Sequence, residues 1–71
     1  MTEAIQKIVD AYVRLNNRQA LEDLRMHRQR LAMNLKARTG YDLSLPLFQV
    51  EHEIAIVETG LDRLVGAAQA A

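Results

Sequence analysis

Apolar residues recur alternately three and four positions apart along the second half of the chain, and this spacing constrains the fold more than any other feature. The residues are Leu47, Val50, Ile54, Val57, Leu61, Leu64 and Ala68. A strand exposes every second residue on one face, whereas this spacing forms one side of an α-helix and covers three heptads of a coiled coil. The pattern predicts a helix over residues 45–66. Because Gly66 lowers helix propensity, residues 67–71 are expected to fray.

A second amphipathic helix is predicted over residues 18–38, where four leucines recur at helical spacing. Gly40 follows as a residue suited to the left-handed end of a helix, and Pro46 suits the first turn of the next one. Two helices joined by a short loop pack as an antiparallel hairpin. The predicted core of this hairpin consists of Leu24, Leu31, Leu35, Val50, Ile54, Val57 and Leu61.

A shorter N-terminal helix is predicted over residues 3–15. After it, Asn16 and Asn17 are weak helix formers but good capping residues. The chain therefore either breaks there into two helices or continues as one long helix whose apolar stripe turns toward a different neighbour. Both interpretations give an all-α fold in a single small domain, residues 1–71.

The short length of the chain favours self-association. A chain of 71 residues buries only about 60% of the surface of its unfolded form, so small domains need a staple. The sequence contains no cysteine, which excludes disulfides and thiolate metal sites. Helix packing and oligomerisation remain, and we expect a homodimer in which two hairpins form a helical bundle with two-fold symmetry.

A second set of apolar side chains lies outside the predicted hairpin core. A helix that is apolar on more than one side is normally buried on more than one side. Either the N-terminal helix folds back over this surface, or a second copy or another protein covers it. The predicted chain–chain interface consists of Met26, Met33, Leu45, Phe48, His52 and Ile56, together with Ile5, Ile8 and Tyr12 of the N-terminal helix.

Charge is balanced overall but unevenly distributed. Nine basic and nine acidic residues cancel, so no global field attracts nucleic acid or an anionic membrane. Residues 25–41 carry four Arg and one Lys without an acid, while residues 42–71 carry five acids and one Arg. The structural interpretation is that these segments form complementary faces of the hairpin. The alternative is a Rop-like nucleic-acid-binding bundle that uses Arg25, Arg28 and Arg30.

The sequence predicts no catalytic, cofactor-binding or metal-binding residues. Glu51, His52 and Glu53 are adjacent, but consecutive residues on a helix point in different directions and do not converge on one ligand. The longest strongly apolar run, residues 54–57, is far too short to span a bilayer. No secretory signal pattern is visible in residues 1–20, so a cytoplasmic, non-enzymatic protein is expected.

Two families resemble this pattern over about residues 21–65. The run from Leu24 to Leu31, a glycine-containing loop and Phe48-Gln49 resemble the small co-chaperones of type III secretion needle subunits. The same stretch, ending in Leu61-Asp62, is similar to short sporulation phosphatases of response regulators. Those phosphatases carry Ser-Gln-Glu where this chain has residues 58–60, Glu-Thr-Gly. Because two unrelated families fit equally well, the pattern indicates a helical hairpin and neither family. From the apolar faces we expect an interaction module, such as a small regulator, adaptor or co-chaperone.

Overall fold

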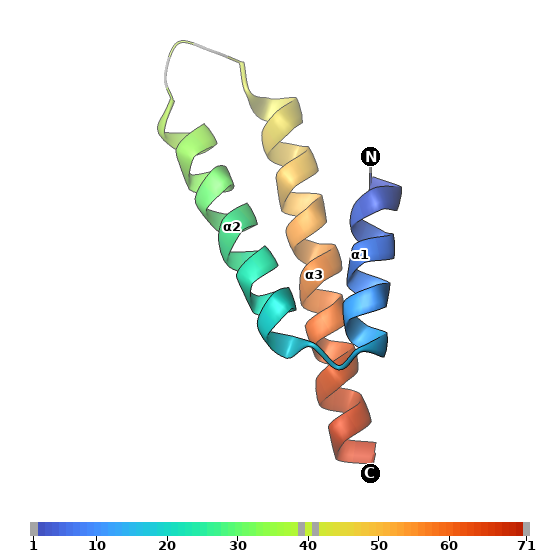
Figure 1. The fold of residues 1–71 in the computed structure, drawn as a ribbon. Coiled ribbons are helices and arrows are strands. Elements are labelled where there is room, and N and C mark those ends of the chain that lie inside the picture. The colour runs from blue at the N-terminus through green and yellow to red at the C-terminus, as the bar shows by residue number, and fades with distance from the viewer. Residues whose placement is uncertain (1, 39, 41, 71) are drawn as a thin grey trace.

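The protein consists of three helices in a computed structural model that describes residues 2–38, 40 and 42–70, with side chains for 3–38, 40 and 42–65. The helices are α1 (Thr2–Arg14), α2 (Arg18–Ala37) and α3 (Ser44–Ala70), and the described ranges contain no strand. The predicted all-α class is therefore confirmed. In Figure 1, α3 descends beside the ascending α2, and α1 descends along another side of α3.

Two adjacent asparagines separate α1 from α2, and each has a different structural role. Asn16 adopts a left-handed backbone conformation with φ of 53°, which asparagine tolerates better than most residues. The N–H of Asn17 donates to the carbonyl of Tyr12 at 2.9 Å, which closes the end of α1. The Asn17 side chain then accepts from the N–H of Ala20 at 3.1 Å and caps α2. The chain thus forms two helices in this region.

A residue that precedes α3 stabilises the N-terminus of this helix. The Asp42 carboxylate accepts from the N–H of Ser44 at 3.2 Å and from its hydroxyl at 2.7 Å, so an acid satisfies groups at the positive end of the helix. Pro46 lies in the first turn, as its fixed φ allows. At its other end α3 continues to Ala70 rather than ending near residue 66, because the alanines after Gly66 favour helix.

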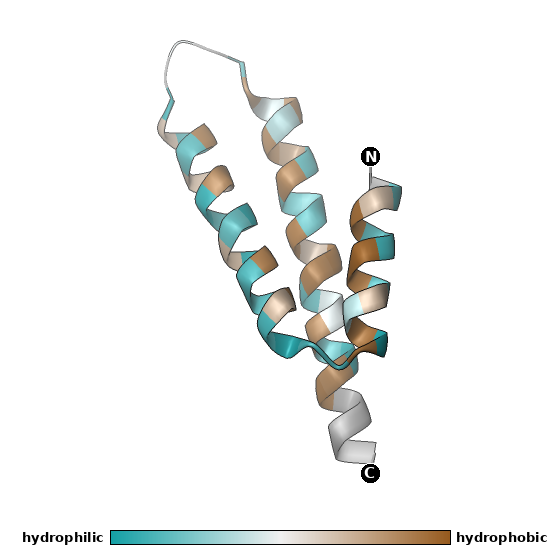
Figure 2. Ribbon diagram, viewed as in Figure 1, coloured by the Kyte–Doolittle hydropathy of each residue, from teal (hydrophilic) through white to brown (hydrophobic). Residues whose placement is uncertain are grey.

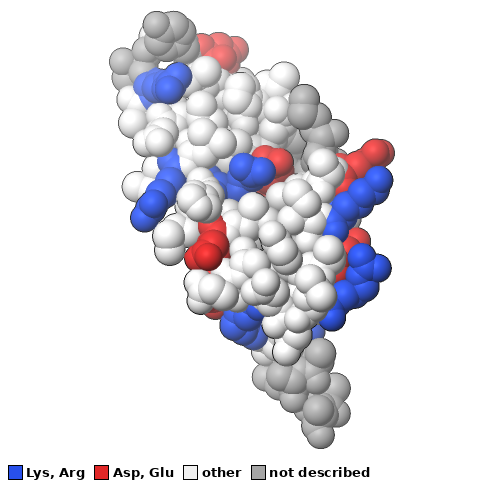
Figure 3. Space-filling model, viewed as in Figure 1, with Lys and Arg blue, Asp and Glu red and all other residues white. Residues whose placement is uncertain are grey.

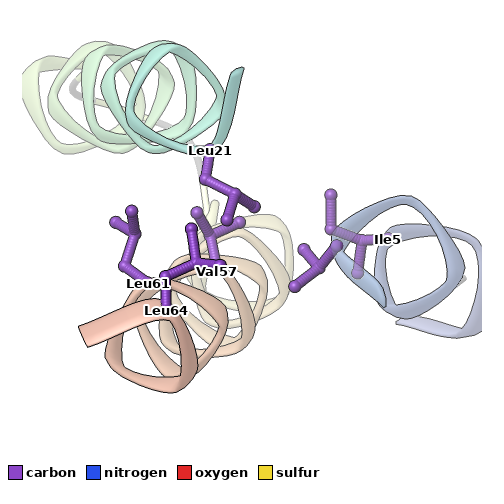
Figure 4. Packing of buried hydrophobic residues seen from close by; sticks show 6 residues of the cluster. Ile5, Leu21, Val57, Leu61 and Leu64 are labelled. Atoms are coloured by element: carbon purple, nitrogen blue, oxygen red, sulfur yellow. The ribbon is translucent and has the colours of Figure 1, made fainter. Parts of the chain in front are cut away.

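The core lies where α3 meets both other helices. Ile5 and Val9 of α1 and Leu21 of α2 pack against three residues of α3, and these side chains point toward one another in Figure 4. The three from α3 are Val57, Leu61 and Leu64. Figure 2 shows the apolar side of α1 turned inward and polar residues along its outer edge. By contrast, α1 and α2 contact each other little, so α3 is the central helix.

Gly60 allows α1 to approach α3 closely. A Cβ atom at this position would lie 2.5 Å from Cγ1 of Val9 and 3.5 Å from Cγ2 of Val13. The first distance is well below van der Waals contact, and valine is stiff about χ1, so the methyl group cannot simply turn away. Glycine in a helix interior costs about 1 kcal/mol relative to alanine. Close packing with α1 is the reason that it is tolerated here.

The predicted core was partly wrong on α2. Val50, Val57 and Leu61 are buried, and Leu24, Leu35 and Ile54 are half-buried, but Leu31 is 40% exposed. Ala32 is buried in its place. The reason is rotational: the side of α2 that faces α3 is centred on positions 21, 25, 28 and 32, so the leucine stripe is turned partly toward α1.

We predict that Gly60→Ala destabilises the protein by about 1–3 kcal/mol, because overpacking against Val9 exceeds the gain in helix propensity. Urea unfolding followed by circular dichroism measures this change. Adding Val9→Ala to Gly60→Ala removes the clash, so the double variant should be more stable than the sum of the two single effects predicts. Strictly additive effects would contradict the assigned contact.

Candidate protein-binding surfaces

One apolar surface lies on α3 near the loop between α2 and α3. It consists of Leu45, Phe48 and His52, and is termed the loop-end patch. Leu45 is 65% exposed and Phe48 is 67% exposed. The Phe48 and His52 rings are nearly parallel, with centroids 6.4 Å apart. α1 has 13 residues against 27 in α3, so it reaches His52 but leaves the turns with Leu45 and Phe48 uncovered.

Met26 and Met33 are exposed as well, at 49% and 69%, but on α2. By helical spacing they lie on the side of α2 turned away from α3. The predicted interface residues of the hairpin therefore belong to two separate surfaces and not to one continuous face.

The fold-back of α1 covers part of the second apolar surface. Ile56 is half-buried and packs against the core. Together with His52 it lines an open groove of about 490 Å³ between α3 and the first turns of α1. Glu3, Gln6 and Lys7 form the α1 side of this groove. Ile56 is thus covered mainly by its own chain.

The three predicted interface residues of α1 lie in different environments. Ile5 is only 2% exposed and belongs to the core, so its prediction as a surface residue was wrong: the apolar stripe of α1 packs against α3 of the same chain. Ile8 is 43% exposed. It lines a groove of about 350 Å³ between α1 and α2, termed the α1–α2 groove. The residues that line this groove are Ile8, Tyr12, Ala20, Asp23, Leu24 and His27.

The sequence predicted only part of this groove. Ile8 and Tyr12 were expected at the interface, but Leu24 was assigned to the core, and Leu15, which is 73% exposed, was given no role. The available signal was the spacing of Ala4, Ile8, Ala11 and Leu15, which places four uncharged residues along one side of α1. That side is adjacent to the stripe that packs on α3.

The basic residues of α2 are used mainly within the chain. Arg28 lies 3.6 Å from the Glu53 carboxylate, and Lys36 lies 3.6 Å from that of Glu51, so both pairs link α2 to α3. Arg25 and Arg28 are half-buried, whereas Arg30 is exposed. By helical spacing Arg30 lies on the opposite side of α2. The three arginines considered for nucleic-acid binding are not brought together on one exposed face.

Another charged contact links α1 to α3. A terminal nitrogen of Arg63 donates to the Asp10 carboxylate at 2.8 Å, and Gln6 donates to the same oxygen at 3.0 Å. These hydrogen bonds, that from Arg63 foremost, lower the pKa of Asp10 below its ordinary value. Lys7 and Arg14 line the same shallow site. The arrangement is an exposed ion pair that sets the register of α1 on α3.

Within the described residues, no group of three or more His, Asp or Glu side chains is arranged to hold a metal ion. In the same part of the chain, no helix combines the length and apolarity that crossing a bilayer requires. Comparison with known proteins finds no matching family model, no similar curated protein and no similar solved structure. The proposed function therefore rests on the exposed surfaces of the protein.

The lowered pKa of Asp10 gives a pH dependence with a definite sign. A depressed pKa in the folded state stabilises the protein above the ordinary value of 3.8, and this contribution is lost as the pH falls through the folded-state pKa. Wild type should therefore resist urea slightly better than Asp10→Asn at pH 7, and the difference should vanish near pH 2. A difference that persists at low pH would assign the effect to something other than the carboxylate.

Arg28 and Glu53 should behave as a coupled pair. The Nε atom of Arg28 is buried and has no hydrogen-bond partner among the described residues, so its charge depends on the nearby Glu53. Glu53→Met alone should cost about 1–3 kcal/mol of unfolding free energy because it leaves that charge unpaired, and Arg28→Met added to it should recover most of the loss. Urea unfolding of the two single variants and the double variant tests this coupling.

Proposed function

We propose that this chain is a small, non-enzymatic interaction module that works as a homo-oligomer, with a dimer as the favoured state, and that binds other protein chains through apolar helical faces. The observation that carries the proposal is the amount of large apolar surface left uncovered. Among the described residues, eight large hydrophobic side chains are at least 39% exposed, and they are distributed over separate surfaces. Exposed apolar patches mark sites of protein–protein interaction, because they promote association.

The total solvent-accessible surface area of the chain also supports association with a partner. A monomeric protein of 8.0 kDa is expected to expose about 4,450 Å², whereas this chain exposes 5,254 Å². The excess of about 800 Å² is close to one partner's share of a standard protein–protein interface. Part of it follows from the elongated shape, 50 × 20 × 16 Å. That shape in turn arises because α1 and α2 are shorter than α3.

Two of the exposed apolar surfaces are suited to binding two different partners. The loop-end patch and the α1–α2 groove lie on different parts of the molecule, so both can be occupied at the same time. An adaptor, a regulator or a co-chaperone in the cytoplasm fits this description. Its action consists of holding or presenting a bound helix, for which no reactive group is needed.

The first test is the mass in solution, measured by light scattering after size exclusion over a hundredfold dilution series. The proposal predicts a mass near twice 8.0 kDa at high concentration, with helicity by circular dichroism unchanged on dilution into any monomer. A chain that remains monomeric at millimolar concentration would contradict the homo-oligomeric function.

A further inference from the structure

The α1–α2 groove is the open side of an incomplete four-helix arrangement. Seen nearly end-on in Figure 4, α1 and α2 occupy different sides of α3. They contact each other little, and the space between their facing sides is the groove. Among the described residues, ion pairs link α1 to α3 and α2 to α3, but none links α1 to α2. Within the described residues, no helix or ion pair closes this side.

The surface of the groove is mostly apolar and continuous with the core. Tyr12 and Leu24 are packed against the core cluster, so the bottom of the groove is part of the same packed interior. Ile8, at 43% exposure, lines the groove. Leu31 is outside the groove lining, but it is four residues beyond His27 and therefore lies on the same side of α2. Figure 3, which views this side, shows a broad uncharged band between charged residues over α2 and along the outer edge of α1.

The polar residues of the groove fit a second copy of the same chain. They are one acid, Asp23, and one histidine, His27, four residues apart on α2. Asp23 already accepts from the Gln19 side chain at 2.9 Å, and its carboxylate has further acceptor positions. If two copies meet through a two-fold axis that crosses α2 between these positions, the helices run antiparallel. Each Asp23 then faces the histidine of the other copy, so the same pairing forms twice across the axis. An unrelated helix would have to supply both a donor and an acceptor at this spacing.

The same axis gives a consistent register on α1. Because α1 and α2 run in opposite directions from a short turn, counting back from Arg14 and forward from Arg18 places Ile8 near the height of the midpoint between Asp23 and His27. All three residues line one groove. An axis at this height places Ile8 against its own counterpart. It also places the large Tyr12 opposite the small Ala4, and Leu31 opposite the region of Ala20. Large residues thus meet small ones across the interface, as close packing requires.

We propose that the α1–α2 groove is the self-association surface of this protein, and that a second copy docks on it antiparallel with Ile8 at the two-fold axis and Asp23 facing the partner's His27. This inference rests on the proposed homo-oligomeric function and assigns it to one surface. The loop-end patch stays free in the dimer.

A cysteine scan tests the proposed axis directly, because the natural sequence contains no cysteine. A disulfide needs two Cα atoms within about 7 Å, which only residues close to a two-fold axis satisfy. Ile8→Cys should therefore oxidise to a covalent dimer in high yield. Leu45→Cys in the loop-end patch is the matched control, since it is more exposed than Ile8 and should remain monomeric on a non-reducing gel.

Charge reversal tests the Asp23–His27 pairing. His27→Glu places two acids against each other, and Asp23→Lys places two bases together, so each should raise the dimer dissociation constant at least about tenfold. The combined variant Asp23→Lys/His27→Glu places an acid opposite a base again and should return the constant to within about threefold of wild type. Phe48→Asp, in the loop-end patch, should leave it unchanged.

The outcomes separate this proposal from the broader one. A dimer that is lost in Phe48→Asp and kept in the groove variants would overturn the groove assignment but leave the homo-oligomeric function intact. A monomer at all concentrations would overturn both. Equal cross-linking of Ile8→Cys and Leu45→Cys would exclude the proposed axis.

Discussion

The arrangement of the three helices depends on a short segment of α3, from Val57 to Leu64, which packs against both other helices. Val57 is fully buried and lies between Leu21 of α2 and the Ile5 and Val9 side chains of α1. Since α1 and α2 contact each other little, each is held in place mainly by α3. A small domain has only one hydrophobic core, and here that core is two turns of one helix and the side chains that reach it.

The helices and their periodicity were predictable from the sequence, whereas their rotation about their own axes was not. The seven-residue pattern of α3 correctly marked Val50, Val57 and Leu61 for burial. On α2, the packing against α3 turns Ala32 rather than Leu31 inward, and no local pattern carries that information. The role of Gly60 was hidden for the same reason, since it depends on Val9, fifty-one positions earlier.

The predicted interface was wrong at one residue of α1. Ile5, Ile8 and Tyr12 were all assigned to it, but Ile5 packs within the chain, whereas the next row of side chains, including Ile8 and Leu15, faces outward. One helical turn contains both kinds of position, so an error of one row exchanges core for surface. The charges were easier to interpret: basic α2 and acidic α3 are linked through Arg28–Glu53 and Lys36–Glu51.

The unequal lengths of the helices make the molecule unevenly cooperative. Near residues 57–64, α3 is flanked by both other helices, while toward the loop it has only α2 beside it, since α1 has 13 residues and α2 has 20. Local opening costs less free energy where fewer apolar contacts must be broken. Backbone amides near the loop should thus exchange with deuterated water through partial opening, and those around Val57 only when the whole chain unfolds. The end of the molecule that presents Phe48 is also the end that can adjust its shape without loss of the fold.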